Sequence, residues 1–483
     1  MRNIAIAVSL AGFACAAPGY RAPEVPVPAT YDVSTPSSVS ARSGGLRTSD
    51  DSARAIHISN SLASAPFWTA LGDTTLTALV AEAQRANLDV RVAESRLSGA
   101  RASRRLARLD LVPTITGTGS SARSQTPLAV TPGLSSQLPA VNLYDVGFDA
   151  SWEVDFFGRV NRNVQAQSAL VESTQHGLED VQISVAAEVA RTYFELRGAQ
   201  QRLAVAQRNA VNQQKIVRLT EDRLSAGSGT AFDTERAKSV LFLTLSATPG
   251  LEAEIASDRN RLAVLLGKSP EQLPTALLDS GPLPRLPDTL YVGSPDQLVR
   301  RRPDVLQAER LYAARSLFVG AARAEYLPRV TFGARVGYTS TTVDSLFKRA
   351  NSRLLLGPVV SFPLFDVGRV RERVEIATAG QEEAQAEYNA TVLGALAESQ
   401  AALITYDRAH ARLSILESAV RSSQRAADLA QQRFDAGLTD FLQVLDAERT
   451  LLDAENQLAL GRTAAATALV AAYKSVGGTW PIK

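Results

Sequence analysis

The residue types that most often carry chemistry are few and scattered in this sequence. The histidines His57, His176 and His410 share no short spacing, so a histidine-based metal or catalytic cluster is not indicated. The chain has no G-x-S-x-G motif, no H-E-x-x-H motif and no glycine-rich phosphate loop with a lysine. The acid pairs at 221–222 and 382–383 are more typical of solvated helix faces than of acid–base catalysis. We therefore expect neither an enzyme nor a bound cofactor or metal.

The single cysteine, Cys15, is the one side chain whose position indicates a reaction. It follows Arg2 and an apolar stretch at 4–14, which has the form of an export signal and is too short to span a bilayer. A lone cysteine at this point is typical of a bacterial lipoprotein signal, in which the thiol receives a diacylglycerol. The alternative is ordinary cleavage at the A-x-A site formed by residues 14–16. No other segment is long and apolar enough for a transmembrane helix, so any membrane would have to be crossed by strands.

Composition excludes one further class of partner. The 483 residues carry a net charge of +2, without the basic excess that nucleic-acid binders usually show. The run Arg300-Arg301-Arg302 precedes Pro303, and we interpret it as a structural or interface feature. No nucleic-acid partner is expected.

The chain repeats itself at a nearly constant offset. The sequence Gly-Arg-Val at 158–160 recurs at 368–370, and Arg223 with Ala226-Gly227 recurs 210 residues later as well. Nearer the start the offset is 215, as Pro113 and Pro328 show. Such a constant spacing over a long stretch indicates a duplicated unit.

The repeat divides the chain into six predicted segments. Each repeat opens with a helix, over 75–108 and 297–324, that ends before a proline. The segments are a signal peptide (1–14), a lipid-anchored N-terminal arm (15–73), a first repeat (74–269), a Pro-rich connector (270–295), a second repeat (296–477) and a C-terminal tail (478–483).

Alternating polarity predicts one β-hairpin in each repeat, over 112–156 and 327–365. In 144–156 the apolar face includes Phe148 and Trp152, while the opposite face is rich in Asp and Glu. The expected strands cover 113–125, 144–156, 329–337 and 353–365. Each is long enough to cross a bilayer, which takes about 9–11 tilted residues.

Four strands cannot close a barrel around a channel, and open strand edges are not tolerated in lipid. Three protomers would supply twelve strands, with the acidic face toward a wet lumen and the apolar face toward lipid. We therefore expect a mixed α and β membrane protein that is complete only as a trimer.

A long helix follows the second strand of each hairpin. Residues 159–224 contain no proline and would form a helix about 100 Å long. An apolar residue recurs at every seventh position, which indicates coiled-coil packing. These positions are Val189, Leu196, Leu203, Ala210, Val217 and Leu224, and then Tyr406, Leu413, Val420, Ala427 and Phe434. Return helices over 233–266 and 440–473 would complete helical hairpins, with tips at 224–231 and 434–440.

Several motifs, taken in order, resemble those of the bacterial outer-membrane factor family, the TolC/OprM-like exit ducts, in their NodT-type lipoprotein branch. They run through nearly the whole mature chain. The matching pieces are Pro18-Gly19-Tyr20-Arg21-Ala22-Pro23, Trp152-Glu153-Val154-Asp155-Phe156-Phe157-Gly158-Arg159, Arg301-Arg302-Pro303-Asp304-Val305, Ser361-Phe362-Pro363-Leu364-Phe365-Asp366, Arg433-Phe434-Asp435-Ala436-Gly437 and Gly477-Gly478-Thr479-Trp480.

The resemblance implies a homotrimer in the outer membrane of a Gram-negative bacterium, with a twelve-strand barrel and a long periplasmic helical barrel. It also implies docking to a periplasmic adaptor protein and to an inner-membrane pump of the resistance–nodulation–division type. Adaptor contact carries over to the tips, and lipidation carries over to Cys15. The tip residues are Leu224, Ser225, Ala226, Gly227, Phe434, Asp435, Ala436, Gly437, Leu438 and Thr439.

A periplasmic constriction in this family carries over to the stretch just before the second tip. The candidates here are Asp428, Gln431 and Gln432. Asp428 would line the pore or, equally, be a solvated charge of the coiled coil.

The resulting prediction is an exit duct that passively exports small molecules. Two alternatives remain open: a duct for one-step (type I) protein secretion and a trimeric coiled-coil tether. The lipid cysteine and the segment 18–23 favour drug or metal efflux.

Overall fold

The computed structural model describes residues 26–28, 57–59, 67–125, 139–287 and 289–478. The predicted signal peptide, Cys15 and its lipidation, the Pro-Gly-Tyr-Arg-Ala-Pro segment and the end of the C-terminal tail lie outside these residues.

The described chain forms two compact units. One comprises Leu97–Thr174 and Ala308–Tyr388, and we call it the strand unit. The other comprises the described parts of Val25–Arg96, Gln175–Gln307 and Asn389–Lys483, and we call it the helical unit.

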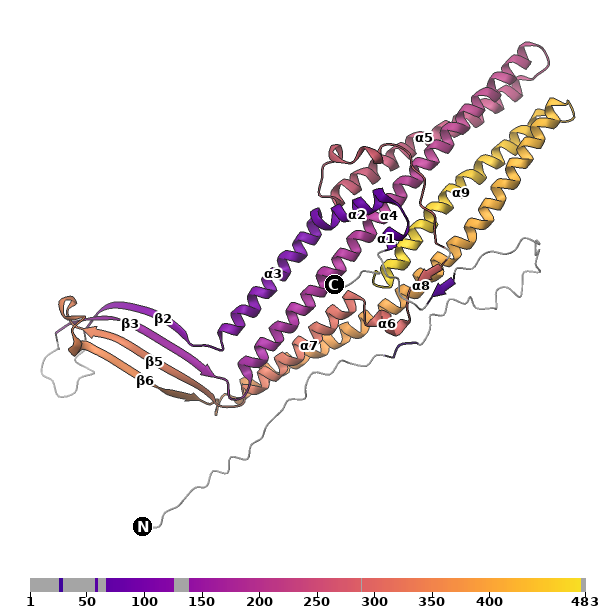
Figure 1. Ribbon diagram of the computed structural model, residues 1–483. Helices are drawn as coiled ribbons and strands as arrows, with labels where there is room; N and C mark the ends of the chain where they lie inside the picture. The colour runs from indigo at the N-terminus through magenta and orange to yellow at the C-terminus, as the bar shows by residue number, and fades with distance from the viewer. Residues whose placement is uncertain (1–25, 29–56, 60–66, 126–138, 288, 479–483) are drawn as a thin grey trace. The chain divides into compact units, whose positions relative to one another are not determined.

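The strand unit contains one four-stranded antiparallel sheet in the order β2-β3-β5-β6. Its strands are β2 (Thr114–Ser124), β3 (Val141–Val154), β5 (Arg329–Ser340) and β6 (Ser352–Ser361), as Figure 1 shows. They lie where alternating polarity predicts them. Because β2 and β6 are the edges, each has one side without a strand partner in the described chain.

Along β3 and β5 the two faces of this sheet differ as the alternation predicts, whereas β6 also places the exposed side chains of Leu355 and Val359 on the charged face. On one face, Asp145 lies 2.6 Å from Arg353, and Asp149 lies 3.7 Å from Arg335 across the β3–β5 pair. The other face exposes large apolar side chains, such as Leu354 at 76%. The charged face is therefore held by cross-strand ion pairs, while the apolar face has no covering layer among the described residues.

Each strand connects directly to a helix of the same unit. α3 (Leu88–Leu109) leads into β2, β3 into α4 (Arg159–Ser225), α7 (Pro303–Ala324) into β5, and β6 into α8 (Val367–Asp435). Within the strand unit, Ala169 of α4 packs against Ala313 and Ala314 of α7. Gln381 of α8 donates to the hydroxyl of Tyr312 on α7 at 3.4 Å. The helices α4, α7 and α8 thus follow the order of their strands.

The helical unit contains the return helices α5 (Ala231–Leu265) and α9 (Phe441–Ser475), together with α2 (Thr74–Ala86). The predicted heptad seam is buried along much of its length, with Val189 and Tyr406 both fully buried and Val217 8% exposed. Pro249 lies inside α5 without ending it. In the described parts of the chain, no helix is both long enough and apolar enough to cross a membrane.

The prediction of one continuous helix over 75–108 is wrong at Asn87. This buried residue ends α2 and begins α3, because its Oδ1 accepts hydrogen bonds from the backbone N–H groups of Asp89 (2.8 Å) and Val90 (3.2 Å). Its Nδ2 also donates to the carbonyl of Leu265 at 2.9 Å. Asn87 thus caps the N-terminus of α3, and its hydrogen bond to Leu265 anchors the junction between α2 and α3 to the end of α5.

The prediction of one helix over 297–324 is also wrong. A short helix, α6 (Pro295–Val299), ends at the arginine run, and α7 starts only at Pro303, where proline suits the first helical position. The arginine run has a structural role, as its position indicates.

Arg302 is the buried member of that run, and its guanidinium joins three helices of the helical unit. It donates to Asp304 at 2.7 Å, to Glu398 of α8 at 2.8 Å and to the carbonyl of Ser475 of α9 at 2.6 Å. Burial lowers the pKa of Arg302, but the hydrogen bonds and charges of Asp304 and Glu398 more than offset it, so the pKa lies above its ordinary value. The side chain therefore stays charged, and its charge is compensated.

The connector is irregular, as predicted, and side chains of the long helices hold it. Arg197 of α4 donates to the carbonyls of Ala276 (2.9 Å) and Asp279 (2.6 Å), and Tyr406 of α8 donates to the carbonyl of Pro287 (2.9 Å). The connector contains the short elements η2 (Pro270–Gln272), η3 (Thr275–Leu277) and β4 (Thr289–Tyr291). Strand β4 pairs in parallel with β1 (His57–Ser59). The remaining short elements are α1 (Phe67–Ala70), η4 (Val343–Ser345) and η5 (Arg349–Asn351).

A partly buried carboxyl lies in the charged network of α4 and α5. The pKa of Asp258 is raised from 3.8 to about 6, first by burial and then by the negative charges of Glu195 and Glu254, while the charges of Arg261 and Arg191 act to lower it. One of its carboxyl oxygens is buried without a hydrogen-bond partner in the described chain. The folded protein therefore disfavours the ionised form of this side chain.

Replacing Arg302 should strongly destabilise the helical unit. Arg302→Ala leaves Asp304 and Glu398 without their cation and should cost about 3–5 kcal/mol of unfolding free energy. Arg301→Ala is the matched control and should change stability by less than about 0.5 kcal/mol, because no ion pair of Arg301 occurs among the described residues. Thermal unfolding followed by helical circular dichroism measures both; equal losses in the two variants would contradict the assignment.

Asp258 should make stability fall as pH rises. Between about pH 4 and pH 6 the folded chain binds more protons at this carboxyl than the unfolded chain, so the folded state loses stability as pH rises through that window. Asp258→Asn should raise the unfolding free energy at pH 7.5 by about 1 kcal/mol, after solvent screening is allowed for, and flatten the pH profile. Melting temperatures from pH 4.5 to pH 7.5 test this; an unchanged profile would argue against it.

Candidate partner-docking tips

The first tip lies between α4 and α5 in the helical unit. α4 ends at Ser225, and Gly227 has a φ of +72°, a conformation that favours glycine. The N–H of Ser228 donates to the carbonyl of Arg223 at 2.9 Å, which satisfies one carbonyl at the helix end. Thr230 then caps α5 by accepting from the N–H of Asp233 at 3.2 Å.

The second tip is built in the same way. α8 ends at Asp435, Gly437 has a φ of +70°, and the N–H of Leu438 donates to the carbonyl of Arg433 at 2.8 Å. Asp440 caps α9 by accepting from the N–H of Gln443 at 3.2 Å. Two tight, rigidly capped turns therefore end the two helical hairpins.

A stacking contact joins the two hairpins near these turns. The guanidinium of Arg223 on α4 lies 4.5 Å from the ring centre of Phe434 on α8. Phe434 also packs against Phe441, with ring centres 5.3 Å apart, and Ile216 of α4 contacts the same cluster. Sequence reasoning selected Phe434 but missed Arg223; the signal available was its recurrence, with Gly227, at an offset of 210.

The tips expose apolar side chains and border a groove. Leu438 is 70% exposed and Leu224 is 40% exposed, both among the predicted contact residues. Phe232 (70%) and Leu442 (41%) are further exposed residues that the sequence did not single out. A groove of about 830 Å³ runs beside the second tip, lined by residues of α8, α9 and Arg236 of α5.

The predicted gate residues lie one to two turns before the end of α8. Asp428 is exposed and accepts from the side chain of Gln424 at 3.0 Å, and Gln431 donates to Asp435 at 2.8 Å. Burial raises the pKa of Glu448 on α9, and the charge of Asp428 adds to this increase. These bonds run along one helix, so a pore-lining role for Asp428, Gln431 or Gln432 stays a prediction.

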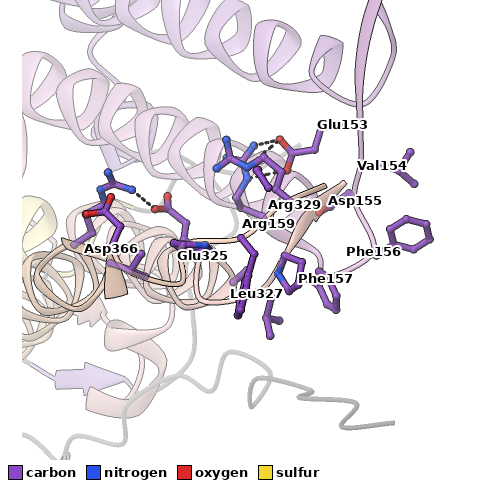
Figure 2. A pocket seen from close by; sticks show the side chains of 17 residues that line it. Glu153, Val154, Asp155, Phe156, Phe157, Arg159, Glu325, Leu327, Arg329 and Asp366 are labelled. Atoms are coloured by element: carbon purple, nitrogen blue, oxygen red, sulfur yellow. Dashed lines mark hydrogen bonds and ion pairs between the residues drawn. The ribbon is translucent and has the colours of Figure 1, made fainter. Parts of the chain in front are cut away.

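A second candidate site lies at the strand–helix junctions of the strand unit. A cavity of about 250 Å³ is bordered by the ends of β3 and β6 and the starts of α4 and α8. Figure 2 shows Glu153 between two arginines: Arg159 donates to it at 2.7 Å, and Arg329 lies 3.6 Å away. Glu325 accepts from Arg373 at 2.6 Å on the other side. These ion pairs connect the strands to the neighbouring helices, and the positive and negative charges compensate each other. We therefore interpret the junction as structural.

Among the described residues, no group of three or more His, Cys, Asp or Glu side chains is placed to hold a metal ion.

The sequence pattern of a known family, described as "Outer membrane efflux protein", matches residues 79–268 and 294–478. The match therefore falls in two separate segments of the chain.

Individual relatives match along most of their length. The cation efflux system protein CusC of Escherichia coli is 27% identical over 476 residues, covering 98% of both chains. The pyoverdine export outer membrane protein OpmQ of Pseudomonas aeruginosa is 30% identical over 421 residues, covering 86% of this chain and 87% of the relative. The solved structure of the outer-membrane channel OprN is 35% identical, with a TM-score of 0.86, covering 95% of this chain and 98% of that chain.

The fold agrees with these matches. Long helical hairpins joined to a small strand unit also occur in the channel OprN, whose chain the comparison covers almost completely. The chain belongs to the outer membrane efflux protein family and is an outer-membrane channel protein of an efflux system.

Proposed function

We propose that the chain is one protomer of a homotrimeric exit duct, through which small molecules pass passively across the outer membrane. An inner-membrane pump of the resistance–nodulation–division type and a periplasmic adaptor would deliver them. The observation that carries this proposal is the continuity of strand and helix: a sheet with two open edges leads directly into helical hairpins that end in twin capped tips.

The open edges support the trimer. The unpaired backbone groups of β2 and β6 need partners in lipid, because no water can satisfy them there. Three copies joined edge to edge would give a closed barrel of twelve strands, an allowed even number. The ion-paired face would line the lumen and the apolar face would meet lipid. Lipidation of Cys15 would add an anchor to the same membrane.

The tips support the adaptor contact. Leu224 and Leu438 are exposed at turns that capping makes rigid, so their apolar surface is presented without a large entropy cost on binding. The groove beside the second tip adds arginines and an acid, which suits a partner of mixed charge.

The names of relatives favour a duct that takes its cargo from the pump. CusC is named for cation efflux and OpmQ for pyoverdine export, two chemically different cargoes for relatives that both match this chain over most of its length. Cargo selection would therefore rest with the pump and the adaptor, and the duct would supply a wet, mixed-charge wall.

Cysteine cross-linking tests the tip assignment. Ser228→Cys and Leu438→Cys place thiols at exposed tip positions and should cross-link to a co-expressed cognate adaptor. Ser280→Cys, exposed on the connector, is the matched control and should not. Cross-linking from Ser280→Cys alone would place the adaptor elsewhere.

Conductance tests the closed duct. Wild-type trimers in planar bilayers should conduct little, whereas Phe434→Ala, which removes the stack on Arg223 between the hairpins, should raise steady conductance. Phe232→Ala is the matched control, since Phe232 is 70% exposed, and should behave like the wild type. High conductance of the wild type would contradict the closed state, and no conductance in any variant would favour a tether.

A further inference from the structure

The helices at the two edges of the strand unit each leave one face uncovered. α3 leads into the edge strand β2, and α8 begins where the edge strand β6 ends. On α3, Arg105 is exposed next to Leu106, which is 68% exposed. On α8, Glu372 and Glu375 are exposed next to Ile376, which is 73% exposed. Apolar side chains flanked by charge are typical of a helix surface that packs against a partner.

The two faces carry opposite charge. Residues 97–109 of α3 contain four arginines at the spacing i, i+3, i+4, i+7 and no acid, so the arginines share one face. Residues 374–388 of α8 contain four glutamates and neither Lys nor Arg. The first two turns of α8 also hold Arg369, Arg371 and Arg373, of which Arg369 pairs with Asp366 and Arg373 with Glu325 inside the protomer. Contact between two α3 helices or two α8 helices would oppose like charges, whereas contact between α3 and α8 would oppose unlike charges.

The internal repeat supplies a template for such a contact. α3 and α7 differ by 215 residues at both ends, and α4 and α8 end 210 residues apart. Within the chain, β3 pairs with β5 and α4 of the first repeat packs on α7 of the second. By the same offsets, α8 of one copy would pack on α3 of the next copy, as β6 would pair with β2.

One contact of the template falls on the charged positions. Arg162 of α4 donates to the carbonyl of Gly320 on α7 at 3.2 Å, and a Cβ added at Gly320 would lie 2.9 Å from Cδ of Arg162. The position 210 residues after Arg162 is Glu372, and the position 215 residues before Gly320 is Arg105. Within the chain, the contact between α4 and α7 places Arg162 over Gly320. At the matching position between copies, Glu372 of α8 would face Arg105 of α3.

A second contact of the template maps onto small residues. Ala169 of α4 packs against Ala314 of α7, and the same offsets give Ala379 on α8 and Gly99 on α3. In the protomer, a Cβ added at Gly99 would meet nothing within 4 Å. Small side chains at both positions allow the two helices to approach closely.

We propose that α8 of one copy packs against α3 of the next, with Glu372 paired to Arg105, and that this charge pattern directs the head-to-tail joining of copies. The partner is a second copy of this chain. The inference rests on the homotrimer of the proposed function and adds which surfaces join and what selects them. A surface ion pair contributes little stability, but wrong pairings of like charge are costly, so the pattern acts on specificity. Heterologous joining of this kind closes into a ring when the rotation from one copy to the next is a third of a turn, as the proposed trimer requires.

Charge reversal in the full-length protein tests the pair. Arg105→Glu and Glu372→Arg should each lower the trimer fraction roughly tenfold in native mass spectrometry of detergent-purified protein, because like charges then meet at every interface. The double variant carrying both changes should recover the wild-type fraction. Arg285→Glu and Glu271→Arg, exposed on the connector, are matched controls and should remain trimeric.

Two outcomes of this experiment separate the inference from the proposed function. Wild-type trimer fractions in both single variants, or no recovery in the double variant, would overturn the charge pairing and leave the duct intact. Monomeric wild-type protein would instead contradict the homotrimer, and the pairing with it.

Disulfide trapping tests the packing independently of charge. Gly99→Cys combined with Ala379→Cys should give covalent dimers and trimers on oxidation, and each single variant, which retains Cys15, should not. A bond formed within one chain, or no cross-link while the trimer persists, would overturn the predicted contact.

Discussion

The backbone groups of two edge strands impose the constraint on which the rest of this structure depends. β2 and β6 each leave one row of N–H and C=O groups without a partner in the described chain. In lipid such groups cost several kcal/mol each when unsatisfied, so a chain of this family can be stable only when copies join. If the sheet lies in lipid, as proposed, the trimer is a condition of its stability as well as a way of enclosing a channel.

An internal repeat would supply partners for these edge strands with a single type of junction. The predicted repeat, at offsets of 210 and 215, would give each protomer one internal β3–β5 junction and would leave a matching junction for the next copy. The residues at matching positions then diverge. The contact of Arg162 with Gly320 lies within one chain, so it needs no charge pattern to select its partner. The proposed contact of Glu372 with Arg105 lies between copies, so opposite charges can select the correct pairing.

Periodicity in the sequence was enough to locate the strands and the long helices, because alternation and heptads extend over many residues. β2 at Thr114–Ser124 and α4 at Arg159–Ser225 lie within about one residue of expectation. Breaks within helices were missed, because a single buried side chain decides them: Asn87 caps α3 while bonding to Leu265, far away in sequence. The tips were located by their repeated Ala-Gly, but the stack of Arg223 on Phe434 depends on tertiary contact alone.

Two arginines of the helical unit make contacts of very different strength. Arg302 is buried and holds three helices through carboxylates and a carbonyl, so moving it would expose an uncompensated charge. Arg223 lies near the tips and holds a ring by stacking, a weaker contact that solvent can replace at little cost. A partner that binds the tips needs to supply only the free energy of such weak contacts to shift the hairpins, while the buried cluster around Arg302 stays closed. Because the two contacts differ in burial, we expect a partner at the tips to shift the hairpins without disrupting the cluster around Arg302.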